Sequence, residues 1–248
     1  MSVELISGHM PILALRGLAV FPDQTVHFDI GRPKSIKALE TAMKGSQILF
    51  LVPHKNIVDD DPKREGLYSV GTVVKVKQVL KNQGENLRVL VSGLCRGRIA
   101  ELDEDKDHLS GVIASIEETA SAPSARKQAL CRYANMLYGK DCELLEHPAQ
   151  AVQLKMLAST EPGRIADSIA QNSGIDYRDK AKLLCQLNPV RRLEHAMRLL
   201  HREMEMLQLE ADIQAKTHAV MDKNQKDYYL REQMRIIRLE LGEGDEES

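Results

Sequence analysis

Polar and apolar residues alternate with a period of two along the first half of the chain. Val26, Phe28 and Ile30 occupy every second position, as expected for a strand with one buried face. A turn-like KNQGEN segment separates two further alternating runs and predicts a β-hairpin. Similar short runs predict strands at residues 11–15, 48–52, 70–80, 87–94 and 109–117. Because only residues 35–43 look helical, we expect a mostly antiparallel β domain with one or two helices.

The pattern changes to a helical period after residues 117–125, which read EETASAPSA. Asp176 and Asn188 precede two of the later segments and are typical N-cap residues. The predicted helices cover residues 124–139, 147–159, 162–172, 177–187 and 190–241. We therefore predict an α+β fold with three parts: a β-rich domain at 1–118, a helical subdomain at 119–189, and a long connector helix with an acidic tail at 190–248.

The last predicted helix is unusually long, because 52 residues from Val190 to Leu241 contain neither Pro nor Gly. As one helix they would extend about 78 Å. Apolar residues form a stripe along this helix, at alternating spacings of four and three residues. The stripe weakens between Gln214 and Asn224. It consists of Leu193, Met197, Leu200, Met204, Leu207 and Ala211 before that gap and of Leu230, Met234, Ile237 and Leu241 after it. Such length is typical of a coiled coil or a rigid connector. We expect the last twenty or so residues to fray or to be held by another copy.

Composition indicates an ordinary folded protein, with 43% apolar and 28% charged residues. The net charge of −2 gives no general attraction to nucleic acid or to membranes. No basic leader is present and no apolar run approaches the roughly 20 residues that a membrane span needs, so we expect a cytoplasmic protein without membrane contact. The four cysteines lack CxxC spacing and are expected to be reduced structural thiols.

Searching for catalytic motifs gives no candidate. The sequence has no GxxxxGK[ST] phosphate loop, no GxSxG elbow and no HExxH zinc motif. His195 and His201 are six residues apart, which is not the spacing of a metal-binding pair on one helix face. Acidic clusters at residues 59–61, 103–107 and 245–247 are interpreted as turns or as a solvated tail. We predict no catalytic residue, no metal site and no cofactor in this chain.

Two kinds of binding surface remain open. The possible phosphate contacts are Lys63, Arg64, Arg96, Arg98, Arg191 and Arg192, but the chain has no Trp and its three Phe are expected in the core. Nucleic-acid binding is therefore not favoured. The Met-rich stretch of the long helix either forms a core stripe or offers an adaptable apolar surface. On the second interpretation the candidate substrate contacts are Met197, Met204 and Met206.

Four stretches resemble the amino-terminal region of the ATP-dependent Lon protease family of bacteria. They are PILALRGLAVFP at 11–22, the hairpin at 70–99 with its GLCRGRI ending, the start of the long helix at 188–216, and DKNQKDYYLREQMRIIRLELGE at 222–243. The last is the most specific, although Met234 stands where Leu is more usual. Residues 236–239 also replace a more polar run. The resemblance covers essentially the whole chain.

The resemblance implies a PUA-like β domain, an α-helical bundle and a long coiled-coil-like helix. It implies a non-catalytic region that recognises damaged or unfolded proteins, with ATP and Mg bound in an AAA+ module and cleavage by a Ser–Lys domain, both beyond this chain. Partners would be protein substrates and the other Lon subunits of a hexamer. The candidate connector or assembly face is Tyr228, Leu230, Met234, Ile237 and Leu241. The alternatives are a nucleic-acid-binding PUA-like module and a free-standing LON-domain adaptor or ligand-binding protein.

Overall fold

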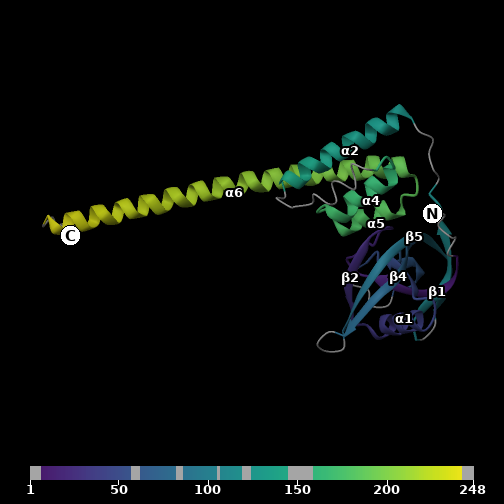
Figure 1. Cartoon of the computed structure of the whole chain (residues 1–248). Coiled ribbons are helices and arrows are strands. Elements are labelled where there is room, and N and C mark those ends of the chain that lie inside the picture. The colour runs from purple at the N-terminus through teal and green to yellow at the C-terminus, as the bar shows by residue number, and fades with distance from the viewer. Residues whose placement is uncertain are drawn as a thin grey trace. The chain divides into compact units, whose positions relative to one another are not determined.

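The computed structural model describes residues 7–56, 62–81, 86–104, 107–118, 124–144 and 159–241. The chain divides into two compact units between His201 and Arg202. The first unit contains the β-sheet and the shorter helices, and the second contains the continuation of the last helix (Figure 1). The predicted helix at 147–159, apart from its last residue, and the acidic tail at 245–247 lie outside the described residues. The three-part domain division remains a prediction.

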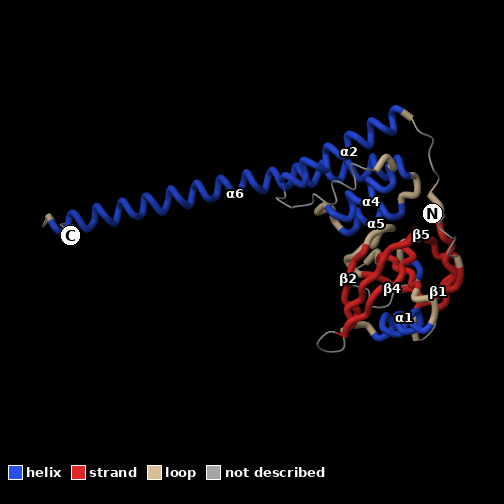
Figure 2. Tube along the Cα trace, viewed as in Figure 1, coloured by secondary structure: helices blue, strands red, loops and turns tan. Residues whose placement is uncertain are grey.

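Six strands form one sheet in the order β2-β5-β4-β3-β1-β6, shown in red in Figure 2. β5 closes the sheet because its 18 residues pair with β2 near one end and with β6 near the other, while β4 pairs along most of its length. β1 and β3 run parallel, and the other described strand pairs are antiparallel. The strands are β1 (Gly8–Leu15), β2 (Thr25–Ile30), β3 (Ile48–Pro53), β4 (Val70–Lys81), β5 (Leu87–Glu104) and β6 (Leu109–Ile116). The predicted antiparallel character and the predicted hairpin are confirmed.

Alternation along the strands builds two apolar clusters on opposite faces of the sheet. Leu13 and Leu15 of β1 join a cluster that includes residues of helix α1 (Pro33–Lys44). Ile12 and Ala14 join the other cluster, around Phe50. Successive side chains of a strand point to opposite faces, so the period of two in the sequence produces both clusters.

Helices dominate after β6. They are α2 (Ala125–Leu144), α4 (Pro162–Asn172), α5 (Tyr177–Cys185) and α6 (Pro189–Glu240), and the β region adds the short 3₁₀ turn η1 (Arg64–Gly66). The Asp176 carboxylate accepts a hydrogen bond from the Arg178 backbone N at 2.9 Å, which confirms it as the cap of α5. Gly139 does not end α2, contrary to the prediction, because an isolated glycine inside a helix costs only about 1 kcal/mol.

α6 is one continuous helix of 52 residues, as the absence of Pro and Gly predicts. The weak stripe between Gln214 and Asn224 does not interrupt it. Over the described residues the helix extends to Glu240. That its last turns fray or are held by another copy remains a prediction. Its first turns are buried, with Leu193 and Leu200 fully covered, whereas every described residue from Arg202 to Leu241 is exposed or half-buried. The predicted α+β architecture with a long last helix is confirmed.

A close backbone approach in the sheet gives a stability prediction. Gly71 of β4 lies against β3, where an added methyl group would collide with the Leu51 carbonyl and lie 2.7 Å from Phe50 Cζ. Because the neighbouring backbone has to move, we expect Gly71→Ala to lower the free energy of unfolding by about 3 kcal/mol. Urea unfolding followed by far-UV circular dichroism measures it. Lys75→Ala, at an exposed position of the same strand, is the control. Equal stability of the two variants would contradict the packing at Gly71.

Candidate functional site

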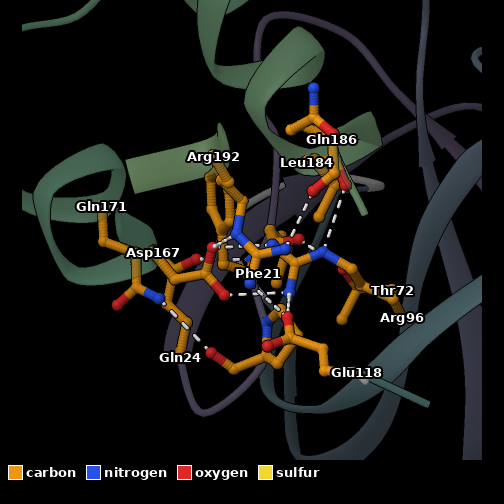
Figure 3. Close-up of polar contacts among 12 residues, drawn as sticks. Phe21, Gln24, Thr72, Arg96, Glu118, Asp167, Gln171, Leu184, Gln186 and Arg192 are labelled. Carbon is orange, nitrogen blue, oxygen red and sulfur yellow. Dashed lines mark hydrogen bonds and ion pairs between the residues drawn. The ribbon is translucent and has the colours of Figure 1, made fainter. Parts of the chain in front are cut away.

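Arg96 of β5 lies at the centre of a buried ion-pair network (Figure 3). Its side chain is 2% exposed. Arg96 Nη1 and Nη2 donate to the two carboxylate oxygens of Asp167 on α4, at 2.9 and 2.6 Å. Nη1 also donates to Glu118 Oε1 at 2.8 Å, and Nε donates to the Leu184 carbonyl of α5 at 3.1 Å. The guanidinium therefore connects the sheet to two helices.

Arg192, in the first turn of α6, completes the ion-pair network. Its side chain is fully buried, its Nη2 donates to Glu118 Oε1, and its Nε lies 3.1 Å from Asp167 Oδ1. Arg192 Nη1 donates to the Gln186 carbonyl at 2.9 Å. Gly163 leaves room for this arrangement, because a methyl group there would collide with the Glu118 carboxylate and lie 2.6 Å from Arg192 Nη2. Two cations and two anions balance, so the buried ion-pair network has no net charge.

The electrostatics of Arg96 match a structural role. Burial alone would lower the pKa of its guanidinium, but the carboxylates of Asp167 and Glu118 outweigh burial and the pKa is raised. The Phe21 ring centroid lies 6.0 Å from the guanidinium carbon and adds a cation–π contact. Arg96 stays charged and paired, so it holds the helices on the sheet and has no proton to exchange.

Two neutral contacts extend this attachment. The Tyr177 hydroxyl of α5 lies 2.6 Å from the His54 carbonyl and 3.3 Å from the Leu15 carbonyl. Burial raises the pKa of Tyr177 to about 12, so its hydroxyl keeps its proton as a donor. Gln171 Nε2 of α4 donates to the Pro22 carbonyl at 3.3 Å. α4, α5 and the start of α6 are thus fixed to the sheet within the first unit.

A groove of about 600 Å³ lies beside α2 and the start of α6. We call it the α2–α6 groove; it is lined by Tyr133, Leu137, Glu194, Met197, Arg198 and His201. Leu137 and Met197 are buried and form an apolar floor. Tyr133 is 49% exposed, and Met136, on the same helix, is 51% exposed. The groove therefore combines an apolar floor, large exposed apolar side chains and a polar edge.

The structure places the predicted substrate contacts differently from one another. Met197 is 9% exposed and lines the α2–α6 groove, whereas Met204 is half-buried and Met206 is 51% exposed in the second unit. The five residues of the predicted assembly face are between 47% and 71% exposed; they are Tyr228, Leu230, Met234, Ile237 and Leu241. Whether these residues bind substrates or subunits remains a prediction.

Arg96 and Arg192 are not available to phosphate groups. We interpreted both as possible basic contacts, and that interpretation is wrong because each is buried and paired with carboxylates. The sequence carried one signal for the ion-pair network: Asp167 borders the buried face of α4, beside Gly163 and Ala170. A carboxylate on a buried face needs a cationic partner. Nothing in the pattern identified which cation it would be.

No other chemistry emerges from the described residues. In those ranges no group of three or more His, Cys, Asp or Glu is placed to hold a metal ion. None of the described helices is long and apolar enough to cross a membrane. Burial is the main cause that raises the pKa of all four thiols, which fits structural cysteines: Cys95, Cys131, Cys142 and Cys185.

Comparison with known families decides the membership of this chain. The family described as "ATP-dependent protease La (LON) substrate-binding domain" matches residues 9–202. The chain belongs to this family. The match to the Lon substrate-binding domain covers the β-sheet, the ion-pair network and the α2–α6 groove together. The Lon resemblance predicted from four sequence stretches is confirmed.

Relatives support the same assignment. Lon proteases of Bacillus thuringiensis and Syntrophomonas wolfei are 38% and 36% identical to this chain, over 94% and 96% of its length. The chain spans 29% of the length of each of these two relatives. The N-terminal domain of a Mycobacterium avium complex Lon protease matches with a TM-score of 0.66 at 19% identity, covering 78% of this chain and 98% of that one. A Xanthomonas campestris Lon N-terminal domain protein matches with a TM-score of 0.54 at 13% identity, covering 75% and 95%. These structures share the Lon domain fold.

The ion-pair network predicts a large difference between two similar substitutions. Asp167→Ala leaves two buried guanidinium groups short of a carboxylate, so we expect the free energy of unfolding to fall by about 3–5 kcal/mol. Asp29 also makes a two-pronged pair, with Arg88 at 2.8 and 3.0 Å, but its side chain is 44% exposed. Because water screens this exposed pair, Asp29→Ala should leave the urea midpoint nearly unchanged. Comparable losses in the two variants would show that the Asp167 pairs are not the main attachment.

Proposed function

We propose that this Lon-family domain recognises protein substrates by binding their exposed apolar segments in the α2–α6 groove. The observation that carries the proposal is the half-exposed Tyr133 beside an apolar floor of Leu137 and Met197. Met136, three residues after Tyr133 on α2, adds a second large exposed apolar side chain outside the groove lining. Large apolar groups gathered at a surface are typical of a protein-binding site. Met and Tyr suit partners of varied sequence, because Met adapts its shape and Tyr provides a broad contact area.

The edge of the α2–α6 groove complements this apolar floor. Glu194, Arg198 and His201 provide donors and acceptors that can pair with the backbone of an extended segment. The edge holds one acid and one permanent base, so it does not favour one charge of substrate. Such a site would select unfolded segments by their accessible apolar residues rather than by a particular sequence.

At the level of the whole protein, we propose a part in an ATP-dependent serine protease that degrades damaged, misfolded and selected regulatory proteins in the cytoplasm. The support is the family membership and the similarity to Lon proteases. ATP and Mg binding and peptide cleavage would belong to modules other than this chain, whose sequence has no phosphate loop and no matching Ser–Lys pair. The exposed face with Tyr228 and Leu230 would contact other subunits of a hexamer.

Binding that depends on the folding state of the partner tests the recognition proposal. We expect the chain to bind a reduced and carboxymethylated protein, which cannot refold, and not to bind the same protein in its native form. Fluorescence anisotropy of the labelled partner measures both affinities. The physical reason is that unfolding exposes the apolar segments that the groove accommodates. Equal affinity for the two forms would contradict the proposal.

A pair of methionine variants tests the α2–α6 groove itself. Met136→Ser removes apolar contact area, so we expect the affinity for the unfolded protein to fall about five- to tenfold. Met43→Ser is the matched control, because Met43 is 40% exposed on α1 and far from the groove in sequence and fold. Its affinity should be unchanged. Both variants replace surface side chains and should unfold at the parent's urea midpoint. A loss of affinity shared by both variants would argue against this groove.

A further inference from the structure

The second unit carries an apolar stripe with a strict seven-residue period. One set of positions is Met206, Ile213, Val220, Asp227, Met234 and Leu241. Three residues after most of these comes the other set, Leu209, Lys216, Lys223, Leu230 and Ile237. The apolar members are between 47% and 70% exposed. This spacing corresponds to the a and d positions of a coiled coil, and we call these residues the heptad stripe.

The heptad stripe is not a continuation of the stripe that is buried in the first unit. At about 100° per residue, the midline of Met206 and Leu209 lies roughly 150° around the helix from the midline of Leu207 and Ala211. Leu207 and Ala211 continue the 4-3 spacing of Leu193 and neighbouring residues, which pack in the first unit. The heptad stripe therefore needs a partner of its own. A seven-residue repeat also calls for a supercoiled partner helix, because a straight helix drifts by about 20° per heptad.

The charged members of the heptad stripe discriminate between orientations of a second copy. Parallel pairing places each residue against itself, which brings Lys216, Lys223 and Asp227 each against a like charge. Antiparallel pairing places residues at a positions against residues at d positions. With Ile213 opposite Leu230 of the second copy, Lys216 faces Asp227 at two symmetric places. Met206 then faces Ile237, and Leu209 faces Met234. Val220 faces Lys223 at the centre, opposite charges meet on either side of it, and apolar residues meet at both ends.

Flanking charges favour the same register. With Ile213 opposite Leu230, Glu210 lies beside Arg231 and Arg238 of the second copy, and Asp212 lies beside Lys226. A slip of one heptad would keep an opposite-charge pair, Lys223 with Asp227, but it would bring Lys226 against its own equivalent and Asp212 near Glu240. Parallel pairing would bring Glu205 beside Glu210, and Lys226 beside Arg231. Like charges at such positions suppress these arrangements.

We propose that residues 206–237 of α6 pair antiparallel with the same segment of a second copy of this chain, with Ile213 opposite Leu230. The proposal rests on the assembly role of α6 given above and not on substrate recognition. Charge complementarity within one sequence argues for a second copy as the occupant, because reversal removes three like-charge contacts and brings Lys216 against Asp227, while Lys223 faces Val220. Tyr228 lies just outside the heptad stripe and Leu241 lies beyond the paired segment, so the pairing covers three of the five predicted assembly residues: Leu230, Met234 and Ile237.

Cross-linking of the full chain distinguishes the orientations. Ile213→Cys and Leu230→Cys are prepared as separate chains with tags of different mass, mixed under oxidising exchange, and separated without reducing agent. Antiparallel pairing joins the two different variants and leaves each variant alone unlinked. In that arrangement two copies of residue 213 lie 17 residues apart along the axis, or about 25 Å. The parent chain, with its four native cysteines, gives the background.

Each outcome is decisive. Mixed dimers well above background, without self-linked dimers, support the proposal. Self-linked dimers of either variant indicate parallel pairing and overturn it. No cross-link above background shows that a different partner covers the stripe, which also overturns it. Binding of the unfolded protein, measured on the same samples, reports separately on the α2–α6 groove, so failure of one idea is not mistaken for failure of the other.

Charge reversal provides an independent check. Asp227→Lys places Lys against Lys216 in the proposed register, so we expect the self-association constant measured by sedimentation to fall about tenfold or more. Asp222→Lys makes the same change in net charge at a position outside the heptad stripe and should alter the constant less than about twofold. Circular dichroism confirms equal helix content. Equal weakening by both variants would attribute the effect to net charge and overturn the register.

Discussion

Two arginine side chains removed from water hold the first unit together. Arg96 comes from the sheet and Arg192 from the start of α6, and both depend on Asp167 and Glu118 for compensation. A buried guanidinium without its carboxylate is strongly unfavourable, so the helices can dock on the sheet only where these four groups meet. Met197 follows Arg192 by five residues on the same helix. The position of the groove floor therefore depends on an ion pair that binds nothing itself.

Local pattern was sufficient for most of the secondary structure. Val26, Phe28 and Ile30 alternate because one face of β2 is covered, and the 52-residue helix follows from the lack of Pro and Gly. Which distant residues contact one another could not be predicted in the same way. Arg96 had the features of a surface cation in the sequence, and only the three-dimensional structure brings Asp167, 71 residues away, into contact with it. The groove was not predicted because its two sides lie about 60 residues apart in the chain, with Tyr133 and Leu137 on α2 and Met197 on α6.

α6 shows how one helix can serve two separate purposes. Its first turns contribute to the core of the first unit, and its later turns present a stripe on the opposite side. A single averaged measure of amphipathicity hides this change, since the two apolar faces cancel over the full length. The 4-3 spacing in the first and last parts of this helix gave the impression of one interrupted stripe. The change of face, rather than the polar residues between, separates the two stripes.

The ion-pair network also has a consequence for the order of folding. Arg96 and Asp167 are 71 residues apart and Glu118 and Arg192 are 74 residues apart, whereas the hairpin and the helices form from local contacts. Contacts across such long loops form late, after their entropy of closure is overcome. The sheet half and the helical half each contribute one cation and one anion, so neither half is left with net charge while it waits. The ion-pair network would then act chiefly on the rate at which the docked unit opens, making it a source of kinetic stability.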